Sequence, residues 1–386
     1  MYIKRELAAE LKTLATQYPV VTVIGPRQSG KTTLTQECFP DYTYCSLEDP
    51  DIRAYAATDA RGFLKDYPNN VIFDEIQRVP ELLSYIQGIT DRSKEKGQFI
   101  LTGSHQMQLR AEITQSLAGR TALLTLLPLS LYELKDKIED FDRDAIILKG
   151  FFPRVYNDQL DPTKAYANYY HSYIEKDVRQ IIHLKEVSLF EKFIKLLAGR
   201  AGQIINYSSL ASDVGTSGTT IKEWLSVLES SFIVFKLNPY YENFGKRIIK
   251  SPKYYFVDTG LLCYLLNIED AQTLRRDPLI GNIFENFVVM EAMKSRLNKG
   301  KDSNLFFFRD SHKNEVDLLY KKGRALVPIE IKSAETYHPE FAKGIEYFQK
   351  TVPLSTKGCV VYSGNLCPDH ERFSVIHFKD IHTLFS

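Results

Sequence analysis

The sequence predicts an α/β protein made of several domains, and three patterns along the chain support this. Strand-like apolar runs alternate with helix-like stretches over residues 1–150, which is typical of a parallel sheet covered by helices. A helical connector at 151–186 leads to a helix, a helix-turn-helix and a basic hairpin at 187–260. Residues 261–386 return to a smaller α/β pattern, with one long helix and two adjacent strands.

Length and composition limit the classes of protein to which the chain belongs. At 386 residues it is long enough for two or three domains. Its 49 basic residues nearly balance its 48 acidic ones, so any basic patch for a polyanion is local. No apolar run reaches the roughly 18–20 residues of a membrane helix, and the first residues lack a signal-peptide pattern. Five scattered cysteines without a CxxC pair favour a reducing cytoplasm.

The stretch GPRQSGKT at residues 25–32 directly follows the apolar run VVTVI. It fits the GxxxxGK[ST] pattern, in which glycines let successive backbone N–H groups point at one anion. Lys31 is spaced to reach the β and γ phosphates of ATP, and the Thr32 hydroxyl to bind Mg²⁺. A turn without a ligand is the alternative, but the strand before and the helix after favour a phosphate loop. The residues predicted to bind the nucleotide here are Gly25, Pro26, Arg27, Gln28, Ser29, Gly30, Lys31, Thr32 and Thr33.

A second pattern, VIFDE, ends at Asp74 and Glu75. An apolar run followed by Asp-Glu is the Walker B arrangement of phosphate-loop proteins. Asp74 would hold Mg²⁺ through water at the carboxyl end of a strand, and Glu75 would act as general base on the attacking water. A strand that ends in a solvated acidic turn is the alternative for VIFDE alone. Its combination with GPRQSGKT favours phosphoryl transfer to water.

The strand FILTGS and the stretch after it add candidates to the same site. Thr102 and Ser104 end the strand, and a hydroxyl there would contact the γ-phosphate or the water, as the sensor residue does in the AAA+ superfamily. Arg120, at the end of SLAGR, resembles the AAA+ arginine finger, which stabilises transition-state charge. A cation that satisfies a helix dipole is an equal alternative for Arg120. The predicted catalytic residues are Lys31, Glu75 and Arg120.

Strand-like runs occur at 20–24, 42–47, 70–75, 98–104 and 121–129, so one of the five lies between the phosphate loop and VIFDE. This arrangement favours the AAA+ and STAND side of the P-loop NTPases. A nucleoside or shikimate-type kinase is the competitor. Kinases usually lack the catalytic Glu after the Walker B Asp, so the DE pair favours hydrolysis.

Residues 187–260 show the order helix, helix-turn-helix and hairpin that is typical of a winged helix. Ser217 lies near the start of the last helix and Trp224 on its apolar side. The segment NFGKRIIKSPK at 243–253 carries four cations and no acid, which suits a wing that lies on phosphates. Winged helices also serve as AAA+ lids and protein-contact modules, so DNA is one of several candidate partners.

The last third carries a spacing of acidic residues that points to a second site. Asp317 lies in the strand EVDLLY, and Glu330 and Lys332 lie on one face of the strand LVPIEIK. Asp-x12-Glu-x-Lys is the spacing of the PD-(D/E)xK nuclease superfamily, in which carboxylates hold Mg²⁺ against a phosphate. Glu285, near the start of the preceding helix, would be a further ligand. Ordinary edge residues are the alternative, but charges in such apolar strands are costly to bury alone.

Taken in order, these motifs resemble those of the prokaryotic AAA-type ATPases that carry a C-terminal domain of unknown function. The motifs are GPRQSGKTTL, VIFDEIQRVPELL, ILTGSH, SLAGR, GFFP, YIEKDV, GNIFENFV, EVDLL and IEIKS. The resemblance covers nearly the whole chain. It implies an ATP-binding protein related to STAND and archaeal-type ATPases, followed by a winged helix and a restriction-endonuclease-like domain. It supplies no substrate.

Two functions fit these patterns. In the first, ATP hydrolysis gates a C-terminal domain that cleaves DNA. In the second, the protein is a nucleotide-dependent switch whose last domain binds nucleic acid or protein and cuts nothing. Arg120 acting on ATP held by a neighbouring subunit would require an oligomer.

Overall fold

The computed structural model describes residues 2–93, 95–104, 116–138, 142–173, 187–240 and 251–385. The chain divides into two compact units. Unit 1 comprises residues 1–129 with the short segments 230–232 and 297–301. Unit 2 comprises residues 130–229, 233–296 and 302–386.

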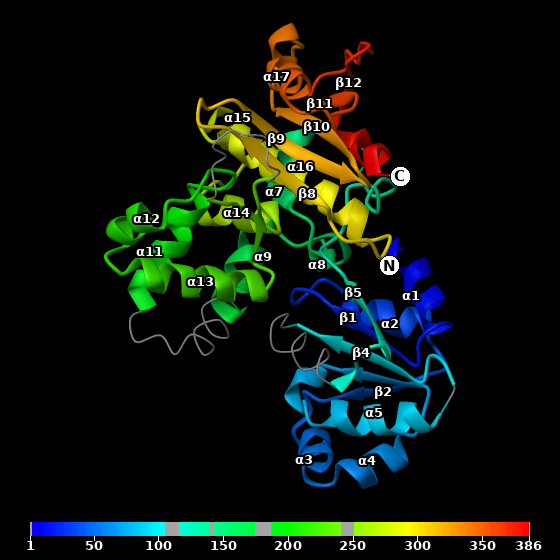
Figure 1. Cartoon of the computed structure of the whole chain (residues 1–386). Helices are drawn as coiled ribbons and strands as arrows, with labels where there is room; N and C mark the ends of the chain where they lie inside the picture. The colour runs from blue at the N-terminus through cyan, green and yellow to red at the C-terminus, as the bar shows by residue number, and fades with distance from the viewer. Residues whose placement is uncertain are drawn as a thin grey trace. The chain divides into compact units, whose positions relative to one another are not determined.

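Unit 1 is built on a five-stranded parallel sheet with the strand order β2-β3-β4-β1-β5, covered by helices on both faces (Figure 1). Its strands are β1 (Val20–Ile24), β2 (Thr43–Ser46), β3 (Val71–Asp74), β4 (Phe99–Gly103) and β5 (Thr121–Thr125). Its helices are α1 (Leu7–Ala15), α2 (Lys31–Cys38), α3 (Pro50–Thr58), α4 (Ala60–Asp66), the 3-10 turn η1 (Ile76–Arg78) and α5 (Leu82–Arg92). The parallel α/β sheet predicted from the sequence is therefore confirmed.

Alternate residues of the buried strands face the two helical layers of unit 1. Val23 of β1 joins Leu34 of α2 in one buried cluster. On the other face, the ring of Phe73 in β3 lies 5.6 Å from that of Phe63 in α4 and 6.0 Å from that of Phe99 in β4. Because both faces of the sheet are buried, the polar site residues collect where the strands end.

Unit 2 contains a second, mixed sheet with the order β12-β11-β10-β9-β8. β8, β9 and β10 are antiparallel neighbours, whereas β10, β11 and β12 run parallel. Its strands are β8 (Leu305–Arg309), β9 (Glu315–Lys322), β10 (Ala325–Lys332), β11 (Gly358–Tyr362) and β12 (Phe373–His377). The helices next to these strands in sequence are α16 (Ile280–Leu297), η3 (Pro339–Ala342), α17 (Lys343–Thr351) and η4 (Phe378–Phe385).

The earlier part of unit 2 is mainly helical, with one two-stranded antiparallel sheet. The elements in chain order are α7 (Arg143–Lys149), α8 (Pro153–Asn157), α9 (Pro162–Tyr169), α11 (Val187–Ala198), α12 (Tyr207–Val214), α13 (Gly218–Ser230), β6 (Val234–Leu237), β7 (Lys253–Phe256), α14 (Thr259–Leu265) and α15 (Ala271–Arg276). The predicted apolar position of Trp224 agrees with the structure, since its ring lies 5.5 Å from Phe190 and 5.2 Å from Phe193.

The predicted hairpin at 240–258 differs from the observed one. β7 pairs with β6, a segment that lies before the predicted hairpin. The helix ends at Ser230, and after a short turn β6 begins at Val234, where β-branched Val234 and aromatic Phe235 suit a strand. Most of the predicted basic wing, at 241–250, lies outside the described residues, as do the connector motif YIEKDV beyond Tyr173 and most of the predicted helix that begins at residue 105. The winged helix stays a prediction.

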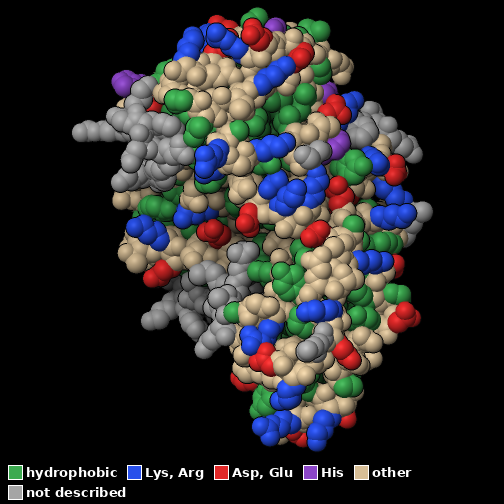
Figure 2. All heavy atoms as spheres, turned by 45° about the vertical axis from the view of Figure 1, so that its right-hand side comes forward, with side chains coloured by type: hydrophobic (Ala, Val, Ile, Leu, Met, Phe, Trp, Pro, Cys, Tyr) green, Lys and Arg blue, Asp and Glu red, His purple; other side chains and the backbone are tan. Residues whose placement is uncertain are grey.

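Basic and acidic side chains are interspersed over the face drawn in Figure 2. None of the helices in the described ranges combines the length and hydrophobicity that a membrane span requires.

The buried side chain of Asn286 extends the hydrogen bonding of β7 into α16. The backbone N–H of Phe256 donates to Asn286 Oδ1 at 2.7 Å, and Asn286 Nδ2 donates to the carbonyl of Phe256 at 2.8 Å. Asn286 is fully buried, so no water replaces these bonds. α16 therefore acts as the neighbour that satisfies one edge of β7.

We expect Asn286→Ala to destabilise unit 2 by about 3 kcal/mol or more, because it leaves a buried N–H and a buried carbonyl without partners. Urea unfolding followed by the fluorescence of Trp224, the single tryptophan, measures this change. Asn282→Ala is the matched control, since half-buried Asn282 makes one bond of 3.2 Å to the Ala201 carbonyl. Equal losses in the two variants would contradict the role given to Asn286.

Candidate functional site

The loop that carries GPRQSGKT lies directly after β1 and closes tightly on itself. A Cβ atom on Gly25 would lie 2.0 Å from the carbonyl oxygen of Leu126, so only glycine fits there. Gly30 has φ 90° and ends the loop in a left-handed conformation, from which α2 begins at Lys31. Gln28 has φ 63°, and Thr33 is exposed in the first turn of α2. The N-terminus of α2 thus faces the loop, as an anion site requires.

Lys31 lies buried inside this loop. Its Nζ donates to the carbonyls of Gly25 at 3.1 Å and Pro26 at 3.0 Å. Burial lowers the pKa of Lys31, although the charges of Glu75 and Asp74 oppose this shift. Both hydrogen-bond partners are neutral carbonyls, so an anion in the loop would offer the ammonium of Lys31 a stronger hydrogen bond.

Arg5, which precedes α1, holds the loop from behind and was not found by sequence reasoning. Its guanidinium donates to the carbonyl of Ser29 and to that of Leu127, both at 2.7 Å. The side chain is buried, so these charge-assisted bonds are protected from water. No local motif marks Arg5, because its partners lie 24 and 122 residues away in the sequence.

The carboxylate of Asp74, at the end of β3, joins three neighbouring elements. Thr32 Oγ1 of α2 lies 3.1 and 3.0 Å from its two oxygens. Thr102 of β4 donates to Oδ1, and the phenol of Tyr44 in β2 donates to Oδ2 at 2.8 Å. Burial and the charge of Asp74 raise the pKa of Tyr44, so the phenol stays protonated as a donor. Tyr44 was missed because only the strand order brings β2 beside β3.

Glu75 follows Asp74 in a left-handed conformation, with φ 55° and ψ 49°, which is uncommon for a residue with a side chain. Its backbone N–H donates to Thr102 Oγ1 at 3.2 Å, which ties this turn to β4. Ser104 donates to Glu75 Oε2 at 2.8 Å, and Gln77 donates to the same oxygen. Burial alone would raise the pKa of Glu75, but the charge of Lys31 and these two donors outweigh it, so the pKa lies below its usual value.

A group of charged residues borders the loop. Arg27 of the loop lies 3.8 Å from Glu48, and Arg78 of η1 lies 3.5 Å from the same carboxylate oxygen. The charge of Arg27 also acts on the pKa values of Lys31 and Glu75. The structure thus brings the nucleotide-site candidates of the loop, β3 and β4 to one edge of the sheet.

Arg120 does not join this group within the chain. It immediately precedes β5, and its carbonyl accepts from the N–H of Val20 at 3.3 Å, at the start of β1. Because β1 and β5 are parallel and in register, Arg120 lies at the edge opposite the phosphate loop, roughly 16 Å away along the strand. Its guanidinium pairs with Asp91 of α5, with Nη2 at 3.0 Å from Oδ2.

The predicted acidic residues of the last third converge in unit 2. Lys332 Nζ lies 3.1 Å from Asp317 and 2.5 Å from Glu330, and Asp317 also accepts the N–H of Ile331 at 2.8 Å. Asp317 and Glu330 therefore share one face of the sheet, as their spacing predicted. Burial raises the pKa of Glu330, and the charge of Asp317 raises it further.

Glu285 of α16 reaches the same region. Burial raises the pKa of Glu285, and the charge of Asp317 raises it further, although Lys253 opposes this shift. Glu285 Oε1 accepts from Lys253 Nζ at 2.9 Å and from the phenol of Tyr255 at 2.6 Å, both on β7. Lys253 was predicted to lie on the basic wing, but it is 2% exposed and pairs with carboxylates instead. Among the described residues, no group of three or more His, Cys, Asp and Glu side chains is arranged to hold a metal ion.

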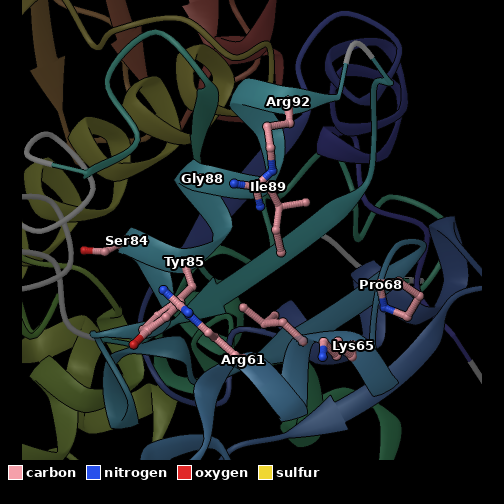
Figure 3. Close-up of a pocket in the computed structure, with 9 residues that line it drawn as sticks. Arg61, Lys65, Pro68, Ser84, Tyr85, Gly88, Ile89 and Arg92 are labelled. Carbon is pink, nitrogen blue, oxygen red and sulfur yellow. The ribbon is translucent and has the colours of Figure 1, made fainter.

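A cavity of about 890 Å³ lies elsewhere in unit 1, between α4 and α5 (Figure 3). Arg61 and Lys65 of α4 and Tyr85 and Arg92 of α5 line it. It shares no residue with the phosphate loop. The predicted nucleotide site is therefore an open edge of the sheet and not this cavity.

Three known families match successive regions of the chain. Residues 17–135 match an AAA domain. Residues 140–272 and 280–381 match two domains of unknown function, DUF8612 and DUF4143. Together with the parallel sheet and the loop geometry, the first match defines the class of unit 1, which is a P-loop domain of the AAA type.

Two mycobacterial relatives identify the family. The chain is 30% identical over 338 residues to the uncharacterized protein Rv2008c of Mycobacterium tuberculosis. The matched region covers 86% of this chain and 74% of that protein. The uncharacterized protein Mb2031c of Mycobacterium bovis shows the same identity and the same coverage. The chain belongs to the family of these proteins. Among solved structures, the Walker-type ATPase PABY2304 of Pyrococcus abyssi is 14% identical, with a TM-score of 0.45 over 68% of this chain and 96% of that one.

The lowered pKa of Glu75 predicts how acid affects stability. A carboxylate with a depressed folded-state pKa adds stability above its unfolded-state pKa, and this stability is lost as pH falls through the folded value. The parent should therefore lose more unfolding free energy than Glu75→Gln when pH is lowered from about 6 to about 3. Denaturant titrations followed by circular dichroism measure the loss, and the exposed Glu81→Gln is the control. Identical acid losses in the parent and Glu75→Gln would contradict the shift.

Proposed function

We propose that unit 1 binds Mg²⁺-ATP at residues 25–32 and hydrolyses it, and that its nucleotide state controls binding of a nucleic-acid or protein partner by unit 2. The observation that carries this proposal is the meeting of Lys31, Asp74 and Glu75 at one edge of the parallel sheet. These three side chains supply a phosphate-binding cation, a metal-binding carboxylate and a base.

The residues of the loop suit a nucleotide. The hydroxyl oxygen of Ser29 is buried and has no hydrogen-bond partner among the described residues. Among the described residues, Lys31 donates hydrogen bonds to two neutral carbonyls of its own loop, which leaves its ammonium available to phosphate oxygens. Thr32 and Asp74 lie within hydrogen-bond distance of each other and would together hold Mg²⁺. The ion, when bound, would offset the charge of the phosphate oxygens.

Glu75 is placed to act as the base. Its depressed pKa keeps it ionised at neutral pH, and the Ser104 and Gln77 side chains fix Oε2. Both bonds use Oε2, so Oε1 is the oxygen proposed to take the proton from the attacking water. Ser104 donates a hydrogen bond to Glu75 and is proposed to contact the γ-phosphate as well, so that it would link the two.

A second candidate function is metal-dependent cleavage of nucleic acid by unit 2. The convergence of Asp317, Glu330 and Lys332 favours it, because this is the set that a nuclease-like site requires. In that case ATP hydrolysis would gate cleavage, and plasmid nicking in Mg²⁺ that depends on Asp317 would detect it.

Replacing Lys31 or Glu75 should separate binding from chemistry. Lys31→Ala removes the cation from the phosphates and should abolish ATP binding or hydrolysis. Glu75→Gln keeps the shape but removes the base, so bound ATP should persist while hydrolysis slows by about 10²-fold or more. Fluorescent-ATP binding and phosphate release measure the two steps.

Lys65→Ala, which removes an exposed lysine of unit 1, is the control for Lys31→Ala. Normal affinity and turnover in Lys31→Ala would refute the nucleotide site. Parent-like hydrolysis in Glu75→Gln would place the base on another residue.

Arg120 is proposed to act on ATP held by a neighbouring subunit, since it lies at the far edge of its own sheet. Arg120→Ala and Lys31→Ala should each be inactive alone, and mixing them should restore part of the ATPase activity at mixed interfaces. Arg92→Ala, at the end of α5, is the control for loss of a surface cation. A protein that stays monomeric in ATP and still needs Arg120 would refute action between subunits.

A further inference from the structure

Lys253 of β7 lies between two carboxylates of unit 2, those of Glu285 and Glu315. Its Nζ lies 2.9 Å from Glu285 Oε1 of α16 and 2.7 Å from Glu315 Oε1 of β9. The side chain is 3% exposed, so water does not screen these pairs. One ammonium therefore joins two carboxylates that come from different elements, as a divalent cation would.

The other carboxylates of the cluster have cationic partners as well. Lys332 lies between Asp317 and Glu330, at 3.1 and 2.5 Å. Arg309 Nη1 lies 2.8 Å from Glu315 Oε2, so both oxygens of Glu315 have cationic partners. Four carboxylates thus face three cations, and the cluster is within one charge of balance. Adding a divalent ion without losing a lysine would leave a net positive charge in a largely buried site, which is costly.

Backbone packing encloses the cluster on the side of Glu330. A Cβ atom on Gly344 of α17 would lie 2.0 Å from Glu330 Oε1. Oε1 of Glu330 therefore lies against the backbone of α17, while Oε2 accepts a hydrogen bond from Lys332. Glu330 is 5% exposed, which leaves little room for a hydrated ion and its water ligands beside this carboxylate.

We infer that Lys253 supplies a cation of this cluster in place of a divalent metal, so that these carboxylates hold no catalytic metal ion and unit 2 does not cleave nucleic acid through one. The carboxylates that a nuclease would use for Mg²⁺ are held by lysines of the chain itself. This inference concerns unit 2 only and stands whether or not unit 1 hydrolyses ATP.

Mn²⁺ binding to the full-length protein, followed by electron paramagnetic resonance of the free ion, tests the inference. The parent should show no Mn²⁺ binding that depends on Asp317 at up to about 1 mM, the weak end of carboxylate sites. Lys253→Met removes the internal cation and should bind about one Mn²⁺ per chain, because oxygen ligands suit this ion. Adding Asp317→Asn to Lys253→Met should abolish that binding.

Lys236→Met is the matched control, since Lys236 lies on the neighbouring strand β6 outside the cluster and should behave as the parent. Asp317-dependent Mn²⁺ binding or plasmid nicking by the parent would overturn the inference, and this measurement decides even where Lys253→Met fails to fold. A folded Lys253→Met protein that binds no Mn²⁺ would also overturn it. A failed ATPase assay changes none of these readouts.

Discussion

The proposed nucleotide site of unit 1 depends on the hydrogen bonds that the carboxylate of Asp74 accepts. This carboxylate accepts hydrogen bonds from hydroxyl groups of α2, β2 and β4. It therefore links α2 to β2 and β4, the two neighbours of its own strand β3. Such charge-assisted bonds at a buried position hold each element in a defined place. The adjacent turn at Glu75 has an uncommon backbone conformation, and it persists because Thr102 ties it to β4 as well.

Both units contain a buried lysine beside carboxylates, yet the two lysines differ in what they leave available. Lys31 donates to neutral carbonyls of its loop, so a phosphate offers it a stronger partner. Lys253 already pairs with two carboxylates and has its charge compensated. This difference supports ligand binding at the first site and a closed charge network at the second.

Much of the geometry of the proposed nucleotide site was predictable because its residues are local in sequence. The loop 25–32 and the pair Asp74-Glu75 each follow a short buried strand, and all five predicted strands of the first sheet occur. The convergence of Asp317, Glu330 and Lys332 also followed from strand periodicity. The electrostatic surroundings of these residues could not be predicted in the same way. Lys253 comes from a strand more than 60 residues earlier, in a segment that the sequence pattern assigned to a basic wing.

The sequence by itself determined the chemistry-bearing residues, since phosphate loops and paired acids depend on the spacing of neighbouring residues along one strand or turn. Tertiary structure alone decided which distant residues complete or close each site. The strand order brings Tyr44 to Asp74 and separates Arg120 from the loop, and the packing of β7 on α16 places Lys253 among the acids. The physical reason is that hydrogen bonds and ion pairs depend on distances in space, and strand order and helix packing set these only when the chain folds.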